Sequence, residues 1–292
     1  MTAATPPQTE PSARVAISVI NMKGGVGKTT IATLPCRRFA RAHKVLAIDL
    51  VPQANMSQAL MGEAGYRQFM DDESPSVVEV LKGYQPPGSV PSPTPLDPAE
   101  IARVVVRGRG ELRIVPSRFD FSDNLCDATR TDVHALARFI ANGFRDVDIV
   151  LIDCAPTESV LTRAAYHASR YVLVPVRPEF FATIGFPLLH ASLEAFREGN
   201  PGHELDVLGV VINDAGYGGG NDGGPEKARA MVEIKNEAAQ HDWRIFSNQI
   251  PYSRGFPKMM RGDYNWLGKA RESFYPFERE LRRCLSEEGY LP

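Results

Sequence analysis

The chain contains 292 residues, of which 43% are hydrophobic and 23% charged, and its formal net charge is −2. This composition is that of an ordinary globular protein, and the near-neutral charge excludes a strong global basic field of the kind that attracts nucleic acids. The four cysteines lie far apart and include no Cys-x-x-Cys pair. We therefore predict neither a zinc site nor an iron–sulfur cluster within one chain.

The amino-terminal segment has no apolar core. Residues 1–13 are rich in Pro and Thr, which predicts a disordered lead-in and not a signal peptide. We expect residues 14–292 to form one domain. No stretch approaches the roughly 18 consecutive apolar residues of a membrane-spanning helix, so we expect a cytoplasmic protein that has no membrane partner.

Short apolar runs alternate with longer helical patterns along this domain. The predicted strands are residues 14–20, 44–50, 111–116, 147–153, 170–176, 205–213 and the less regular 243–251. The predicted helices are residues 28–42, 122–143, 157–168, 181–198, 225–241 and 267–287. Most strands are nearly continuous apolar runs, which is typical of strands buried on both faces of a parallel sheet. The alternation predicts an α/β fold: a single doubly wound, mostly parallel sheet with helices on both faces.

Two segments interrupt the alternation, and one predicted helix contains a proline. The proline-rich residues 84–98 predict an extended surface loop, and the glycine-rich residues 216–224 predict a mobile connector, with a lid as the alternative. Pro35 removes a backbone hydrogen bond inside the predicted helix 28–42, so it should kink or shorten that helix.

The sequence KGGVGKTT, residues 23–30, directly follows the first predicted strand. Its glycines let consecutive backbone N–H groups point into one concavity, and the helix that follows adds its positive end. We predict a phosphate-binding loop, with a turn that binds nothing as the alternative. Its predicted nucleotide-binding residues are Lys23, Gly24, Gly25, Val26, Gly27, Lys28, Thr29 and Thr30. Lys28 would reach the β- and γ-phosphates, and the Thr29 hydroxyl would bind Mg²⁺.

This loop departs from the usual pattern of Gly, four residues, Gly-Lys-Thr. Met22 occupies the position of the first Gly, and Lys23 stands beside it. Two strand ends add carboxylates. Asp153 ends the predicted strand 147–153, where a phosphate-loop protein places a carboxylate near the metal, and Asp49 ends the second strand. Parallel strands deliver such groups to one edge of the sheet, although an Asp there is otherwise often a turn former.

Five segments resemble, in chain order, motifs of the ParA/MinD family of deviant-Walker ATPases, and most closely its ParA (Soj-like) partition branch. They are residues 23–30, 45–57, 112–123, 148–165 and 171–185. The resemblance implies ATP and Mg²⁺ as ligands and a homodimer that forms with ATP. It also implies that Lys23 is the signature lysine, which reaches the phosphates of the partner subunit across the dimer. The implied catalytic residues are Lys23, Lys28 and Asp49.

The chain differs from the family pattern after the second strand. The family usually has Asp-x-Asp-Pro-Gln, in which the second Asp orients the attacking water, whereas this chain has Asp49-Leu50-Val51-Pro52-Gln53. A buried valine can neither hold a water nor accept a proton, and such positioning groups typically contribute about 10²–10⁴-fold. We therefore expect ATP binding with slow or absent hydrolysis.

The remaining contacts follow from the resemblance alone. It points to Asn213 and to the loop that contains Pro251 for the adenine, although an Asn at a strand end is often a turn residue. Non-specific DNA binding would use basic residues near the carboxyl terminus, which are otherwise ordinary solvated side chains. The candidates are Arg244, Arg254, Lys258, Arg261, Lys269 and Arg271.

The function implied is that of an ATP-switched positioning protein. It would dimerise with ATP, associate with nucleoid DNA, and segregate a plasmid, a chromosome or another cellular cargo with a ParB-like or cargo adaptor protein. A hydrolysis-deficient, ATP-bound scaffold is the alternative that Val51 favours. A metabolic or metal-cluster enzyme on the same fold is disfavoured because the paired cysteines of cluster-carrying relatives are absent. The apolar residues of the final predicted helix indicate packing against the core and not a membrane anchor.

Overall fold

The computed structural model describes residues 15–84, 97–119, 132–179, 182–214, 224–251, 256, 258 and 267–291. The predicted lead-in over residues 1–13 lies outside the described residues, as do most of the two predicted loops and the first part of the predicted helix 122–143. The side chains of residues 267–271 are not described either.

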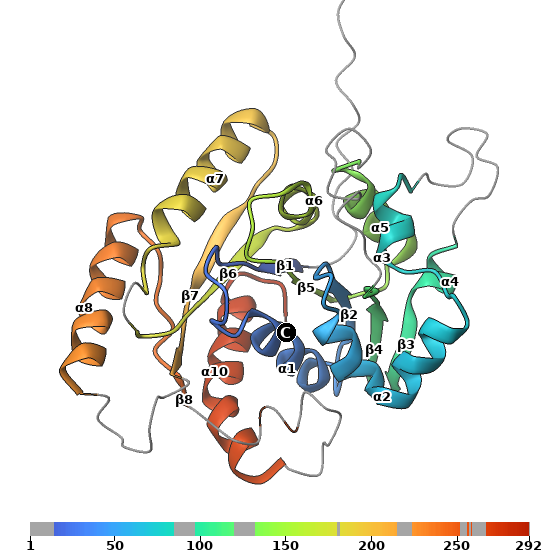
Figure 1. The fold of residues 1–292 in the computed structure, drawn as a ribbon, viewed down its shortest axis with the longest axis horizontal. Helices are drawn as coiled ribbons and strands as arrows, with labels where there is room; N and C mark the ends of the chain where they lie inside the picture. Colours follow the sequence, from blue (N-terminus) through green and yellow to red (C-terminus); the bar gives the residue numbers. More distant parts are fainter. Residues whose placement is uncertain are drawn as a thin grey trace, which may run out of the picture.

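The described strands form one sheet with the order β3-β4-β2-β5-β1-β6-β7-β8 (Figure 1). Neighbouring strands are parallel throughout, except that β3 and β4 are antiparallel. The strands are β1 (Val15–Val19), β2 (Lys44–Asp49), β3 (Arg103–Arg107), β4 (Glu111–Val115), β5 (Ile149–Asp153), β6 (Tyr171–Val176), β7 (Asp206–Asp214) and β8 (Ile250–Pro251). The chain first builds the β2, β3 and β4 side of the sheet, returns to place β5 beside β1, and then runs outward through β6, β7 and β8 on the other side. This order confirms the predicted doubly wound, mostly parallel sheet.

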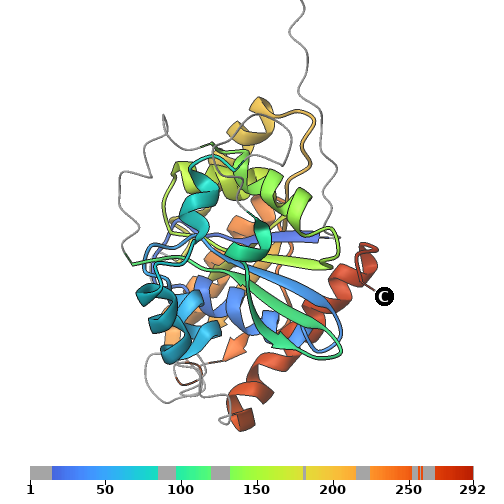
Figure 2. The ribbon, with the colours of Figure 1, turned by 90° about the vertical axis from the view of Figure 1, so that its right-hand side faces the viewer.

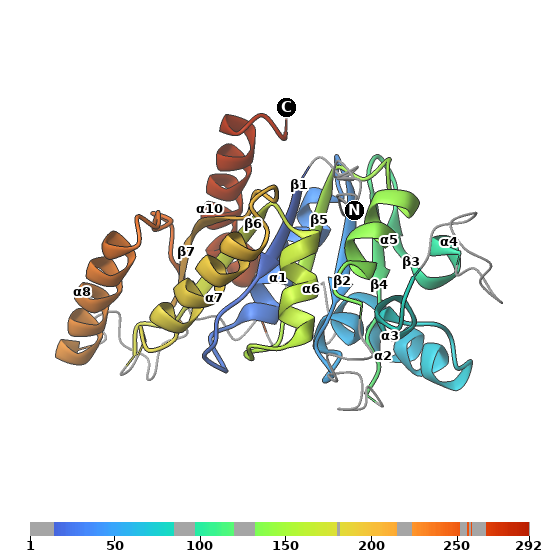
Figure 3. The same cartoon turned by 90° about the horizontal axis from the view of Figure 1, so that it is seen from above.

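Helices cover both faces of this sheet. In Figure 3, α5, α6 and α7 lie in front of the strands, and in Figure 2, α1 (blue) and α10 (red) lie on the other side. The helices are α1 (Lys28–Phe39), α2 (Asn55–Asp71), α3 (Val77–Leu81), α4 (Pro98–Ile101), α5 (Ala135–Gly143), α6 (Val160–Ala168), α7 (Phe186–Gly199), α8 (Gly224–Gln240) and α10 (Leu267–Glu287).

Two apolar layers hold the helices to the sheet, because successive strand residues point to opposite faces. Ile17 packs in the layer that contains Phe277 of α10, whereas Ile48 and Ile152 pack in the layer that contains Phe139 of α5. The apolar residues of the final helix, Phe274, Phe277, Leu281 and Leu285, are buried in this core. That confirms the predicted core packing of the helix. Among the described residues, no helix combines the length and apolar composition required to cross a bilayer.

Several elements differ from the predictions. The predicted helix 28–42 ends at Phe39, and Pro35 lies inside it without ending it. Strand β3 and helices α2, α3 and α4 were not predicted. Strand β8 is only two residues long, and the rest of the predicted strand 243–251 contributes an isolated bridge between Ile245 and Val210. A short edge strand makes too few ladder contacts to impose a regular pattern on its sequence.

Candidate nucleotide-binding site

The predicted phosphate loop lies between the carboxyl end of β1 and the start of α1. Gly25 and Gly27 have φ values of +73° and +92°, in the left-handed region that favours glycine. A Cβ atom at Gly27 would lie 2.2 Å from Nδ2 of Asn213. The loop therefore needs glycine at position 27 both for its backbone conformation and for the approach of Asn213.

The first turn of α1 presents backbone N–H groups toward this loop. Gly27 precedes the helix and offers no capping side chain, and the first turn contains no acidic residue. The first N–H groups of a helix have no partner within the helix, and the helix dipole places positive charge there. The beginning of α1 is therefore suited to bind an anion such as a phosphate group.

Lys28 is held beneath the loop. Its side chain is buried, and Nζ donates a hydrogen bond of 2.8 Å to the carbonyl oxygen of Lys23. Burial lowers the pKa of Lys28 to about 8, while the neighbouring Asp153 raises it. The ammonium group is thus desolvated, and it would gain a stronger counter-charge from a bound phosphate than from the carbonyl group.

Asp153 lies at the end of β5, and Asp49 is its register partner on β2. Both residues are fully buried, and neither oxygen of Asp153 has a hydrogen-bond partner among the described residues. Burial, and secondly the charge of Asp49, hold the pKa of Asp153 well above its usual range. The Thr29 hydroxyl, Lys28 and the backbone of Cys154 oppose this shift in pKa.

These residues fit a magnesium ion. Mg²⁺ prefers oxygen ligands and is commonly held by one or two carboxylates together with the phosphates of its nucleotide. Asp153 offers an orphaned carboxylate, and Thr29 offers a hydroxyl beside it. Across the part of the chain that the structure describes, no three His, Cys, Asp or Glu side chains form a self-sufficient metal site. Mg²⁺ at this place would take further ligands from water and from the phosphates of a bound nucleotide.

Asp49 is engaged in the fold. Its Oδ1 accepts from the backbone N–H of Val51 at 3.0 Å, and its Oδ2 accepts from the N–H and the hydroxyl of Ser57 at 2.8 and 2.7 Å. Burial raises the pKa of Asp49 to about 6, against these hydrogen bonds. The Ser57 hydroxyl in turn accepts from the N–H of Ser117 at 2.9 Å. Asp49 therefore fixes the loop over residues 50–57 and the start of α2, and its predicted catalytic role stays a prediction.

Val51 follows directly in that loop. Its backbone is fixed by Asp49, and its side chain is half-buried, less than expected from the sequence. The apolar side chain offers no atom that could orient a water.

The two residues assigned to the adenine lie on the β7–β8 side of the loop. Asn213 donates from Nδ2 to the carbonyl oxygen of Val26 at 2.9 Å, so it braces the phosphate loop. Pro251 is exposed at the end of β8, one register position beyond the pair of Asn213 with Ile250. Both residues lie at carboxyl ends of parallel strands, as the phosphate loop does. Their contact with adenine stays a prediction.

Lys23 and the buried Asn21 connect the loop to the end of β6. Asn21 accepts from the N–H of Lys23 at 2.8 Å and donates from Nδ2 to the carbonyl oxygen of Pro175 at 2.7 Å. The Lys23 ammonium lies 2.9 Å from Oε1 of Glu179. Sequence reasoning found Lys23 but missed Asn21, Glu179, Ser57 and Ser117. Ser57, Ser117 and Glu179 lie inside the motif segments and Asn21 lies just before one, but no pattern distinguished them from their neighbours.

Most of the candidate DNA-binding residues lie outside the part of the chain that the structure describes. Arg254, Arg261 and the side chains of Lys269 and Arg271 lie outside the described part of the chain. Lys258 is half-buried, and Arg244 contacts Sγ of Cys284 and the carboxylate of Glu287 in the final helix. DNA binding by the predicted residues stays a prediction.

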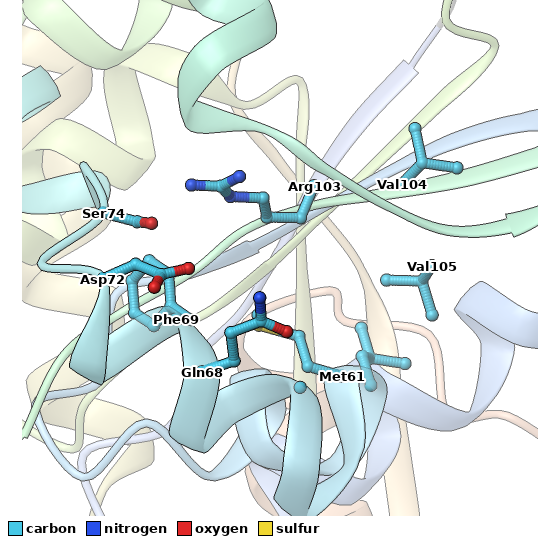
Figure 4. A pocket seen from close by; sticks show the side chains of 10 residues that line it. Met61, Gln68, Phe69, Asp72, Ser74, Arg103, Val104 and Val105 are labelled. Atoms are coloured by element: carbon cyan, nitrogen blue, oxygen red, sulfur yellow. The ribbon is translucent and has the colours of Figure 1, made fainter.

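A separate open hollow lies between α2 and β3 (Figure 4). Phe69, Asp72 and Ser74 line one side of it, and Arg103 and Val105 line the other. No residue that lines this hollow belongs to the phosphate loop or to the Asp49–Asp153 pair. The hollow is therefore not part of the nucleotide site.

Comparisons with known proteins agree with this geometry. A family model described as an AAA domain matches residues 14–204. The chromosome partitioning protein ParA of Caulobacter vibrioides is 36% identical over 204 residues, which cover 67% of this chain and 68% of that protein. The chromosome-partitioning ATPase Soj of Thermus thermophilus is 32% identical over 200 residues, which cover 67% of this chain and 68% of that protein.

Among solved structures, the apo form of Cyanothece McdA superimposes with a TM-score of 0.73 over 91% of this chain and 99% of that one, at 19% identity. A variant of McdA has been solved as an ATP complex. At this identity the likeness shows a shared fold, whereas the family model and the more similar relatives show kinship. The chain belongs to the ParA/MinD family of P-loop ATPases.

Proposed function

We propose that this protein is an ATP-switched positioning protein that dimerises in its ATP-bound state, binds non-specific DNA in that state and segregates a cellular cargo. The observation that carries the proposal is the position of Lys23 at the rim of a complete phosphate loop, in a chain related to ParA and Soj. A second cation beside the loop is not needed to hold a nucleotide within one subunit. It is needed if two nucleotide sites face each other.

Nucleotide binding follows from the site residue by residue. The N–H groups of the loop and of the first turn of α1 would bind the phosphates, and Lys28 would exchange the carbonyl of Lys23 for phosphate oxygens. Asp153 and Thr29 would hold Mg²⁺, which supplies positive charge that offsets that of the triphosphate. Asn213 and Pro251 would flank the base.

The surface next to the loop supports dimerisation. Gly185 lies against the loop, since a Cβ atom there would be 2.7 Å from Oδ1 of Asn21. Its neighbours Ile184 and Leu188 have 59% and 63% of their surface exposed. Large apolar side chains exposed together beside a binding site often mark a protein interface. We assign this surface to the partner subunit, whose phosphates Lys23 would reach.

The expected partners follow from the relatives. The relative from Caulobacter vibrioides is named a chromosome partitioning protein, and that from Thermus thermophilus a chromosome-partitioning ATPase. We propose nucleoid-associated action in the cytoplasm with a ParB-like or cargo adaptor, and a plasmid, chromosome or other body as cargo. The alternative is an ATP-bound scaffold that hydrolyses ATP too slowly to cycle, and the side chain of Val51 favours it.

DNA binding by the ATP-loaded protein tests the proposal. We expect the wild type to bind non-specific duplex DNA with an ATP analogue and Mg²⁺, and the affinity to fall steeply with salt. Lys28→Ala should abolish nucleotide binding and therefore DNA binding. Replacement of Lys258, Arg261 and Lys269 with Glu should weaken DNA binding without affecting ATP binding, and Lys82→Glu is the matched control. Absence of DNA binding by the ATP-loaded wild type would exclude the nucleoid-binding part and leave the scaffold.

A further inference from the structure

Glu179 lies beside the signature lysine within the same subunit. The Lys23 ammonium is 2.9 Å from Glu179 Oε1, and the two side chains are 22% and 32% exposed. On its other side, Glu179 Oε2 lies 3.7 Å from Nε of Arg177. Glu179 is thus a half-buried carboxylate between two cations, on the segment that leaves β6 toward α7.

The surrounding backbone keeps Lys23 close to Glu179. Asn21 accepts from the N–H of Lys23 and donates to the carbonyl of Pro175, so the phosphate loop is bonded to the end of β6, shortly before Glu179. The start of α7 packs against the same place at Gly185. The backbone beside Lys23 is therefore fixed by one buried and one partly buried hydrogen bond and by the close packing of Gly185.

This arrangement competes with the role proposed for Lys23. An ammonium group 2.9 Å from a carboxylate of its own subunit must leave that carboxylate before it can contact phosphates of a second subunit. A carboxylate at the edge of the loop would also repel an approaching triphosphate. Both effects favour the separate subunits over the dimer. After Lys23 leaves, Arg177 remains beside Glu179 as a counter-charge.

We propose that Glu179 is a positioning residue that holds Lys23 within its own subunit and thereby sets the protein concentration at which the ATP-bound dimer forms. The ligand that displaces Glu179 is the triphosphate bound to a second copy of this chain. The inference rests on the proposed function, because it assumes that Lys23 acts across a dimer.

The test is the dimer dissociation constant of Glu179→Gln, measured by sedimentation or light scattering at saturating ATP analogue and Mg²⁺. Glutamine keeps the shape of the side chain and removes its charge. A symmetric dimer breaks two such pairs, each of which contributes a factor of about 2 to 5, so we expect the dissociation constant to fall about 4- to 25-fold. Glu179→Asp should lie between Glu179→Gln and the wild type. The affinity of the dilute monomer for the ATP analogue should not change. A variant with a general folding defect would lose this affinity, so the measurement separates the two effects.

Two further variants isolate the effect. Glu194→Gln removes a carboxylate of α7 that pairs with Arg197 at 2.6 Å, and it should leave the dissociation constant unchanged. In a Lys23→Ala background, which we expect to stay monomeric, Glu179→Gln should not restore the dimer, because the lysine that it held is absent.

The outcomes separate the two claims. If the wild type dimerises through Lys23 but Glu179→Gln has the same or a higher dissociation constant, the role of Glu179 is wrong and the proposed function stands. If Lys23→Ala dimerises as the wild type does, or if no variant dimerises with the analogue, the proposed function fails and this inference fails with it.

Discussion

The ends of β2 and β5 carry two aspartates that are alike in position and burial but differ in their contacts. Asp49 and Asp153 are register partners on neighbouring strands, and both are fully buried. Asp49 accepts hydrogen bonds from Val51 and Ser57, whereas both oxygens of Asp153 lack a partner among the described residues. A buried carboxylate without partners destabilises the fold. We infer that Asp49 holds the chain in place and that Asp153 is kept for a ligand.

The largest effect is expected from Asp153→Asn. Mg²⁺ should increase the affinity of the wild type for ATP, and loss of a carboxylate beside the metal should reduce this increase by more than about 100-fold. Groups that only support metal ligands already contribute about 10- to 100-fold to metal affinity. Binding of the nucleotide without Mg²⁺ should change little. Calorimetric titration with an ATP analogue, with Mg²⁺ or with chelator, measures both. If Mg²⁺ increased the ATP affinity of the variant as much as that of the wild type, the metal would have to be bound by other residues.

Val51→Asp adds a carboxylate to the loop over residues 50–57, which Asp49 holds. The backbone of residue 51 is already fixed by its hydrogen bond to Asp49, so the new carboxylate would be placed to orient a water. We expect turnover to rise by about 10²-fold if positioning is its main contribution. The ATP-bound dimer should become shorter-lived to match. Single-turnover hydrolysis with the same DNA and Mg²⁺ gives the rates, and Val51→Asn is the uncharged control. Equal rates would mean that Asp49 or a partner protein already orients the water.

Asp49→Asn is the matched partner of Asp153→Asn in a measurement of stability. An amide at position 49 points an N–H group toward a buried N–H donor of Val51 or Ser57, so we expect a loss of about 2 kcal/mol in the free energy of unfolding. Asp153→Asn should change that free energy by less than about 1 kcal/mol, because it removes a carboxylate that has no hydrogen bond to lose. Urea unfolding in chelator, without nucleotide, compares the two. Equal losses would contradict the division of roles.

The smallest effect is a dependence of stability on pH. Burial raises the pKa of Asp49 from 3.8 to about 6 and holds that of Asp153 well above its usual range, so the folded protein keeps protons that the unfolded chain loses. This site should therefore destabilise the nucleotide-free protein, by roughly 3 kcal/mol for Asp49, as the pH rises from about 4 through 6 and above. The lowered pKa of His167 acts in the opposite direction over the same pH range, so the net change in stability is small. The difference between wild type and Asp153→Asn isolates the site, and a wild-type slope in the variant would show that Asp153 titrates normally.

The central part of the fold could be predicted from the sequence because its strands are buried on both faces. Strands such as β5 have no solvated side, so their sequences are continuous apolar runs. Strand β3 was missed because it is a partly exposed edge strand with a register irregularity between Val104 and Val106. Helix α2 was missed because Gly62 has a φ of +76° and interrupts its helical period.

The residues of the candidate site also divide into those that the sequence predicted and those that it did not. The phosphate loop is local in sequence, so its glycines, Lys28 and Thr29 could be named from the residues alone. The partners that support it are distant in the chain. Asn21 bonds to Pro175, 154 residues away, and Asn213 bonds to Val26, 187 residues away. No local pattern contains such pairs, since the topology of the sheet brings them together.

The most direct measurement is the mass of the protein in solution with a non-hydrolysable ATP analogue and Mg²⁺, for the wild type and for Lys23→Ala. We expect a dimer for the wild type, and a monomer without nucleotide. Lys23→Ala should bind the analogue with similar affinity, because Lys28 and the loop remain, but it should stay monomeric. A normal dimer of Lys23→Ala, or a wild type whose mass does not respond to the analogue, would contradict an ATP-switched dimer built on this lysine.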